Sequence, residues 1–147
     1  MKRYESLKEI FFQDIEKNVY GLYKQKAYFH SLQVATLCQV YARKRDLNIE
    51  IASVIGLFHD YSLYINHSSF QHGERSSNMI EKYLVDFSDV EKQIIMQAIR
   101  HHSEKEVIHD CYSELIKDMD LLAKYNDDSQ TVFKNHEQRR IEKILSE

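Results

Sequence analysis

The sequence predicts an all-α protein, a single-domain bundle of about six or seven helices over residues 1–147. The chain has no proline and only three glycines, so residues that interrupt helices are scarce. Apolar residues recur at helical spacing in most segments. A length of 147 residues suits one well-buried core. We expect that core at about residues 28–125, with an N-terminal helix in 1–27 and a C-terminal helix in 128–147.

The first two expected helices cover about residues 4–20 and 27–46. In the first, the residues at helical spacing are Leu7, Ile10, Phe11 and Ile15. In the second, one stripe at i, i+4, i+7, i+8 and i+11 holds His30, Val34, Leu37, Cys38 and Tyr41. Because this stripe is otherwise apolar, His30 is expected to face inward.

The third expected helix opens at Asn48, a good N-cap residue, and ends near His59 and Asp60. Residues 51–58 carry no charge and run straight into this His-Asp pair. A helix that is apolar nearly all round belongs in a core. An ionised carboxylate is costly there unless it is paired, hydrogen-bonded or bound to a metal. The rest of the chain must therefore supply a partner.

The fourth and fifth helices follow a polar stretch at residues 62–71. The fourth is expected over about residues 72–86, starting at the His-Gly pair. Ser88 and Glu91 precede an apolar run and form a capping box, which predicts the start of the fifth helix. That helix is expected to end at residues 101–102.

The sixth and seventh helices complete the bundle. After a loop at residues 103–110, the sixth helix carries Asp118 and Asp120 beside leucines and isoleucines. The seventh, at about residues 129–145, is the most polar. It is the candidate for loose packing or for assembly into a homodimer.

Composition and charge exclude several classes of protein. Twenty basic against 23 acidic residues give a net charge of −3, so no nucleic-acid partner is expected. Two cysteines, Cys38 and Cys111, are too few for a disulfide framework and suit reduced thiols in packing positions. The N-terminus turns acidic before any apolar run, and no run reaches the roughly 18 apolar residues of a membrane span. We therefore expect no membrane contact and a cytoplasmic location.

The chemistry of the chain lies in its histidines and aspartates. Seven such residues fall near helix ends or on apolar faces: His30, His59, Asp60, His72, His101, His102 and Asp120. Imidazole nitrogen and carboxylate oxygen together suit divalent Mn, Fe, Co, Ni or Zn. Each residue taken alone is more often a hydrogen-bonded core residue or a helix cap. The order and spacing of the whole set favour a shared metal site.

The same ordered series resembles the HD-domain superfamily of metal-dependent phosphohydrolases. Residues 29–35 resemble its first-histidine segment, and residues 57–60 resemble its His-Asp signature. Residues 98–102 and 117–122 resemble the segments with the later histidine and the last aspartate, and His72 stands between them in the matching order. The resemblance spans about residues 28–125 and implies an HD-like helical fold.

Carried over residue by residue, the resemblance implies one or two divalent ions per chain. One ion would be held by four ligands: His30, His59, Asp60 and Asp120. The second would be held by His72 and His102, with Asp60 bridging. The additional histidines place the chain near the two-metal branch, which includes symmetrical diadenosine tetraphosphatases and some phosphodiesterases.

Two ligand choices are left open by periodicity. His101 and His102 both fall on apolar stripes, and only the family pattern favours His102. Asp118 and Asp120 pose the same question, and the following Leu121-Leu122 favours Asp120. His101 is then a candidate proton donor or supporting residue, although stacking or capping explains it equally well.

One departure from the family concerns the substrate phosphate. Many members have a lysine close behind the His-Asp pair, whereas residues 61–63 here are Tyr-Ser-Leu. The cation that meets the phosphate would then be Arg75, Arg100 or Lys105. Each of the three is equally well explained as a solvated surface cation.

The resemblance implies a metal-dependent phosphohydrolase that cleaves a phosphate ester or anhydride. Its partner would be a small phosphorylated substrate such as a nucleotide or dinucleotide, attacked by a water that the metal acidifies, with Asp60 at the centre of the site. Two alternatives remain. One is an HD-type di-iron oxygenase. The other is a non-catalytic metal- or nucleotide-binding module, which the missing lysine favours.

Overall fold

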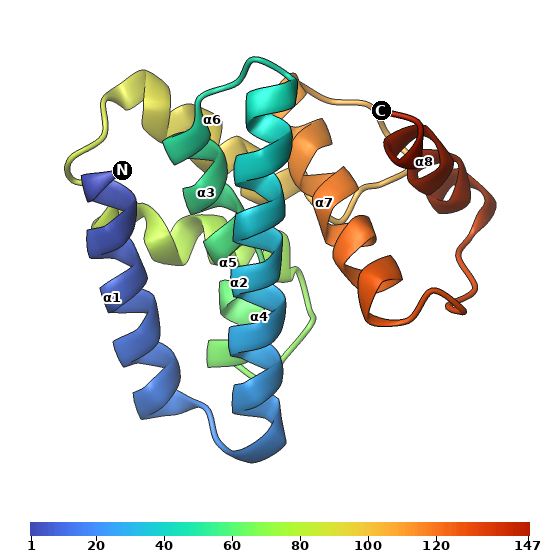
Figure 1. The fold of residues 1–147 in the computed structure, drawn as a ribbon. Coiled ribbons are helices and arrows are strands. Elements are labelled where there is room, and N and C mark those ends of the chain that lie inside the picture. Colours follow the sequence, from blue (N-terminus) through green and yellow to red (C-terminus); the bar gives the residue numbers. More distant parts are fainter.

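The computed structural model describes residues 1–147, and every regular element in it is helical. The all-α class predicted from the sequence is confirmed. Eight α-helices and one 3-10 helix follow one another along the chain (Figure 1): α1 (Lys2–Asn18), α2 (Gly21–Lys44), α3 (Ile49–Phe58), α4 (Tyr61–Ile65), α5 (His72–Ile80), η1 (Glu81–Tyr83), α6 (Asp89–His101), α7 (Cys111–Asp127) and α8 (Asn135–Leu145).

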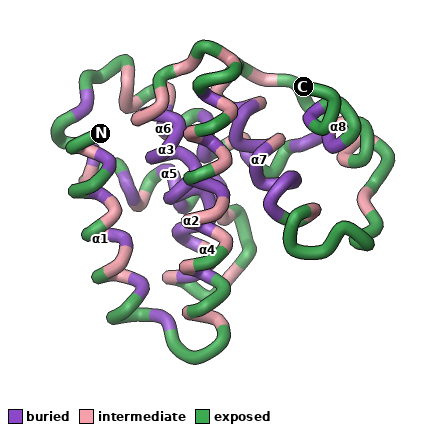
Figure 2. Tube along the Cα trace, in the orientation of Figure 1, coloured by how far each residue is buried: buried purple, intermediate pink, exposed green.

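Helix α3 lies at the centre of the bundle and packs against α1, α2, α6 and α7. All residues from 51 to 58 are buried, as the uncharged run predicts (Figure 2). The approach of α2 to α3 is close enough to require glycine. A Cβ atom on Gly56 would lie 2.8 Å from the Cα atom of Ala35. The His-Asp pair therefore follows directly after a helix that is held in place by its neighbours on several sides.

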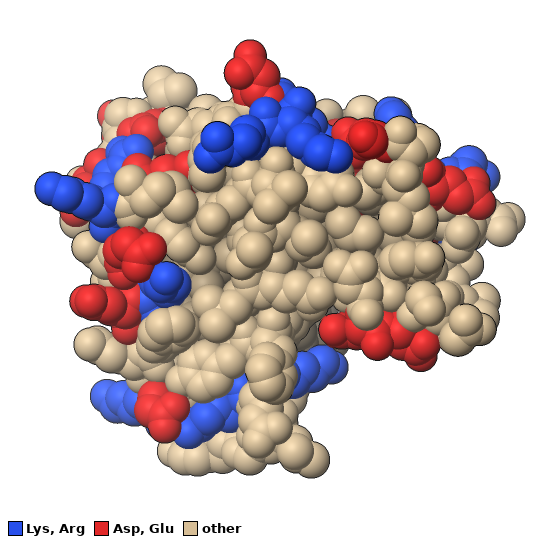
Figure 3. All heavy atoms as spheres, in the orientation of Figure 1, with Lys and Arg blue, Asp and Glu red and all other residues tan.

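The outer helices cover this centre unequally. Helix α1 buries one apolar stripe, and the ring of Phe11 meets that of Phe58 edge-on at 5.7 Å between centroids. Helix α8 packs on α7 and buries only Ile141 and Ile144 (Figure 1). On the face drawn in Figure 3, charged side chains of both signs lie mainly around the margins, and most of the middle is uncharged. None of the helices is both long and apolar enough to cross a membrane.

The predicted helix caps are present in the structure. The side chain of Asn48 accepts a hydrogen bond from the backbone N–H of Ile51 at 3.0 Å. The Ser88 hydroxyl accepts one from the Glu91 N–H, and the Glu91 carboxylate accepts one from the Ser88 N–H. These caps provide hydrogen-bond acceptors for backbone N–H groups that have no partner within the helix at the starts of α3 and α6.

Several boundaries differ from the sequence prediction. Helix α2 begins at Gly21 and not near residue 27. Helix α4 covers Tyr61–Ile65, most of it within the segment expected to be a polar loop, because Tyr61 and Tyr64 are buried against the core. Helix α5 ends at Ile80, where the chain tightens into η1. The last helix begins at Asn135 and not near residue 129, since residues 128–132 are all exposed and no packing stabilises a helix there.

Candidate metal centre

The six residues of the implied ligand set come from six different helices or their ends. Four of them lie at the ends of helices that meet near the C-terminal end of α3. His59 follows α3, Asp60 precedes α4, His72 begins α5 and His102 follows α6. His30 and Asp120 lie within α2 and α7. The structure brings all six together.

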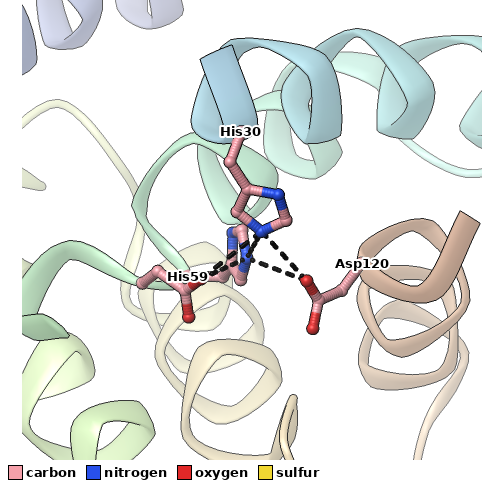
Figure 4. A group of neighbouring side chains, drawn as sticks. His30, His59 and Asp120 are labelled. Atoms are coloured by element: carbon pink, nitrogen blue, oxygen red, sulfur yellow. Dashed lines mark hydrogen bonds and ion pairs between the residues drawn. The ribbon is translucent and has the colours of Figure 1, made fainter. Parts of the chain in front are cut away.

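Four of these side chains form a first group, drawn in Figure 4. The Nε2 atom of His30 lies 3.0 Å from the Oδ1 atom of Asp120 and 3.2 Å from the Nε2 atom of His59. The Nε2 atom of His59 lies 3.1 Å from the Oδ2 atom of Asp60. His59 is fully buried, and Asp60 and Asp120 are nearly so.

A second group shares Asp60 with the first. The Oδ1 atom of Asp60 lies 3.2 Å from the Nε2 atom of His72 and 3.1 Å from that of His102. The two Nε2 atoms lie 3.1 Å apart. Asp60 thus turns one oxygen to each group, which is the arrangement of a carboxylate that bridges two ions.

The tautomer of three histidines is set by backbone carbonyls. The Nδ1–H groups of His59 and His102 donate to the carbonyl oxygens of Gly56 and Ile99, both at 2.7 Å. His72 donates in the same way to Ser69 at 3.0 Å. Each acceptor lies three residues before its histidine. In the neutral form of each ring, the lone pair is therefore on Nε2 and directed into the centre, as metal ligation requires.

The donor atoms fit divalent cations. The Nε2 atoms of His72 and His102 lie 3.1 Å apart, and because both rings carry a proton on Nδ1, this contact between neutral rings is favourable only with a cation between them. The Oδ1 atom of Asp120 is buried without a hydrogen-bond partner, a state that is costly unless an ion satisfies it. Donors that bind one ion at about 2.1 Å in adjacent octahedral positions lie about 3 Å apart, which matches both groups.

The electrostatics of these side chains point the same way. Burial lowers the pKa of His59, but the carboxylates of Asp60 and Asp120 outweigh it and raise the pKa to about 10. Burial raises the pKa of Asp60, and the surrounding histidines, His59 first, hold it well below its ordinary value. Burial lowers the pKa of His102. Both carboxylates are thus ionised at neutral pH, and the centre attracts positive charge.

The six residues lie in or beneath a cavity of about 760 Å³, a size typical of small-molecule sites. Its walls include residues outside the ligand set, among them Lys26, Phe29, Lys105 and Lys124. The metal groups are therefore accessible to a ligand of nucleotide size.

Comparison with known proteins agrees with this geometry. The family model of the HD domain matches residues 27–125, most of the chain and all six ligand positions. The chain belongs to the HD domain family. This HD domain is 30% identical over 102 residues to "Ribonuclease Y" of Geobacter sulfurreducens and of Geobacter metallireducens, and 29% identical to that of Pelobacter propionicus. Each match covers 69% of this chain and 18% of the relative. No solved structure matches the chain significantly.

In each of the two pairs left open by the sequence, one residue lies in the centre of this HD domain and the other lies outside it. His102 lies in the centre, whereas the ring of His101 stacks on His109 at 4.0 Å between centroids and does not line the cavity. Asp120 lies in the centre. Asp118 instead forms ion pairs with Arg45 at 2.9 Å and Arg140 at 3.0 Å.

The three cations considered for the substrate phosphate have different positions. Arg75 lies over the ring of Phe70 at 5.2 Å, and Arg100 lines a separate pocket with Asp89, so neither reaches the cavity. Lys105 does line the cavity, but it is buried and its Nζ atom lies 2.8 Å from the Oδ2 atom of Asp120. This contact holds the carboxylate of Asp120, a candidate metal ligand.

Several cavity residues were not singled out by the sequence, and two of them, Lys26 and Phe29, lie on α2 with His30. The signal that identifies them is helical spacing, because Phe29 and His30 stand three and four positions after Lys26 and so lie on the same side of the helix.

Proposed function

We propose that this HD domain is a metal-dependent phosphohydrolase that cleaves a phosphate ester or anhydride bond of a nucleotide or dinucleotide. The observation that carries the proposal is the position of Asp60. Its two oxygens face two separate groups of ligands at the base of one cavity. Two-metal hydrolases hold their ions in this way to bind attacking and leaving oxygens together.

The chain supplies the ligands of both ions in this proposal. His30, His59, Asp60 and Asp120 hold one, and Asp60, His72 and His102 hold the other. Mixed nitrogen and oxygen donors favour Mn, Fe, Co, Ni or Zn. Ions bound here supply an acidified water and polarise a phosphoryl oxygen. The protein fixes the ring tautomers through backbone carbonyls and keeps Asp120 oriented through Lys105.

The substrate phosphate meets Lys26 and Lys124 in this proposal, in place of Arg75, Arg100 and Lys105, the three cations expected from the sequence. Lys26 lines the cavity, is exposed and forms no ion pair in the structure. Lys124 also lines it, is half exposed and lies 3.6 Å from the Oδ2 atom of Asp120. Lys26 is therefore the cation that is free to bind a phosphate oxygen.

Two classes of substrate are considered, a small nucleotide and RNA. The relatives carry the name ribonuclease, which brings a phosphodiester of RNA into consideration for this chain. A net charge of −3 provides little of the sequence-independent attraction that long nucleic acids need. A small nucleotide or dinucleotide therefore remains the proposed substrate, and a short oligoribonucleotide belongs in the test.

The experiment loads purified protein with Mn²⁺, Co²⁺ or Ni²⁺ and offers mononucleotides, dinucleoside polyphosphates, p-nitrophenyl phosphate and a short oligoribonucleotide. We expect product release from at least one nucleotide, lost in Asp60→Asn and retained in Arg75→Gln, which alters a cation outside the cavity. No product from any substrate, with metal shown to be bound, would overturn the proposal.

Two further measurements address the alternatives. Oxygen consumption by the iron-loaded protein with an organic substrate would favour the di-iron oxygenase. Tight nucleotide binding without turnover would favour the non-catalytic module. Under the proposal, neither is observed.

A further inference from the structure

The cavity wall carries one exposed aromatic side chain, that of Phe29. The ring is 73% exposed although it adjoins a metal ligand, His30, in the sequence. The other apolar residues of the cavity, Leu63 and Tyr64, are half-buried and buried. The rest of the wall is polar or charged, so Phe29 is the apolar surface that the cavity presents to a ligand.

The ring of Phe29 has no aromatic or cationic partner in the structure. This distinguishes it from another exposed phenylalanine, Phe70, which is 61% exposed and carries Arg75 over its face at 5.2 Å. The exposed surface of this ring is available to a planar ligand. Stacking on a base is favourable for any base, because every base has a π-face.

Helix α2 arranges the groups that a nucleotide needs along one side. Lys26, Phe29, His30 and Gln33 all line the cavity, at i, i+3, i+4 and i+7. One helical turn rises about 5.4 Å, so the cation, the ring and the metal ligand lie within two turns. A phosphate held by the metals and Lys26 would leave its attached base beside Phe29.

We propose that Phe29 is the stacking platform for the nucleobase of the substrate and selects nucleotides over simple sugar phosphates. This inference rests on the proposed function for the position of the phosphate. Base–aromatic stacking corresponds to about 5- to 150-fold in affinity. The site therefore discriminates by the base, while the metal centre and Lys26 bind any phosphate group.

A tryptophan variant tests the platform directly, because the chain has no tryptophan. Phe29→Trp, loaded with Zn²⁺, has a single indole in the cavity. We expect AMP to quench its fluorescence in a saturable way within seconds of mixing. Ribose 5-phosphate should compete without quenching. The matched control is Phe70→Trp, whose indole lies outside the cavity and should show no saturable quenching. Equal quenching of both variants would overturn the proposal.

Affinity measurements separate this inference from the proposed function. In Phe29→Ala we expect the affinity for AMP to fall by about 5- to 150-fold, with the affinity for ribose 5-phosphate unchanged and Phe29→Tyr close to wild type. Wild-type protein that binds both ligands equally would refute the platform and leave the phosphate site intact. Protein that binds neither ligand, nor inorganic phosphate, would overturn both proposals.

Discussion

Lys105 and Asp120 form a buried ion pair, with the Nζ atom 2.8 Å from the Oδ2 atom. The other oxygen of Asp120, Oδ1, faces His30 and His59. The lysine thus holds the carboxylate by the oxygen that does not face the histidines. Because buried charges are costly without a partner, this pair fixes the orientation of a carboxylate that the proposed metal site uses.

Replacing Lys105 by methionine should weaken metal binding. Loss of a residue that orients a ligand typically lowers metal affinity by about 10- to 100-fold. The affinity for Zn²⁺, measured by competition with a chelator, should fall by that amount in Lys105→Met and change little in Lys124→Met. Unchanged metal affinity with a raised KM would instead assign Lys105 to the phosphate.

Replacing Gly73 by alanine should destabilise the fold and loosen the centre. A Cβ atom there would lie 2.8 Å from the carbonyl oxygen of Arg100 and 3.1 Å from that of Ile99, which holds the ring of His102. Overpacking of this kind costs about 1–3 kcal/mol. Denaturant unfolding should show this loss in Gly73→Ala but not in Asn78→Ala, an exposed position on the same helix. Equal stability of the two variants would contradict the account.

The stability of the protein in acid should depend on Arg3. Its guanidinium pairs with Glu50 at 2.8 Å and with Glu91 at 3.0 Å, joining α1, α3 and α6. The Arg3 hydrogen bond lowers the pKa of Glu91 from its ordinary value of 4.5 to about 2. Because the folded-state pKa is the lower one, the stabilisation is present above pH 4.5 and is lost as the pH falls towards 2.

Thermal unfolding between pH 7 and pH 2 measures this dependence. Arg3→Met should unfold at a lower temperature than wild type at pH 7, and the two curves should converge in acid. Lys8→Met serves as the control, because it removes a surface pair with Glu5 and a contact with the ring of Tyr4 but touches neither Glu50 nor Glu91. If the unfolding temperatures of wild type and Arg3→Met stay parallel over this pH range, Arg3 does not lower the pKa of the carboxylates that it pairs with.

Replacing Lys26 by glutamine should weaken substrate binding and leave the chemical step nearly unchanged. A hydrogen bond to a charged group contributes about 1.5–3 kcal/mol, and partial exposure favours the lower end. We expect KM to rise about tenfold, with kcat within about twofold of wild type. Lys24→Gln is the matched control, because Lys24 lies on the same helix and pairs with Glu16 outside the cavity. An equal effect of both substitutions would exclude a specific role.

The helices and their caps follow from local sequence signals. Asn48 and Ser88 were identifiable as caps because a capping side chain bonds to a backbone N–H two or three residues away. Helix α4 was missed because only five residues form it and tertiary burial of Tyr61 and Tyr64 stabilises it. Interactions within a few residues are visible in sequence, and packing between distant segments is not.

The same distinction applies to the site. The six ligand positions are marked by residue type, order and the family resemblance. The role of the cations depends on where helices cross. Lys105 is buried against a carboxylate 15 positions later, and Arg75 turns to the ring of Phe70. No periodic pattern distinguishes either from a solvated surface residue.

The number of divalent ions bound per chain tests the central claim most directly. After loading with Zn²⁺ and exhaustive dialysis, elemental analysis should find two ions per wild-type chain, since Asp60 faces two ligand groups. His72→Ala should retain one ion, because it removes a ligand of the second group alone, and Asp60→Ala should lose both. Wild-type protein that holds no tightly bound ion, or a metal content unchanged in both variants, would contradict the account.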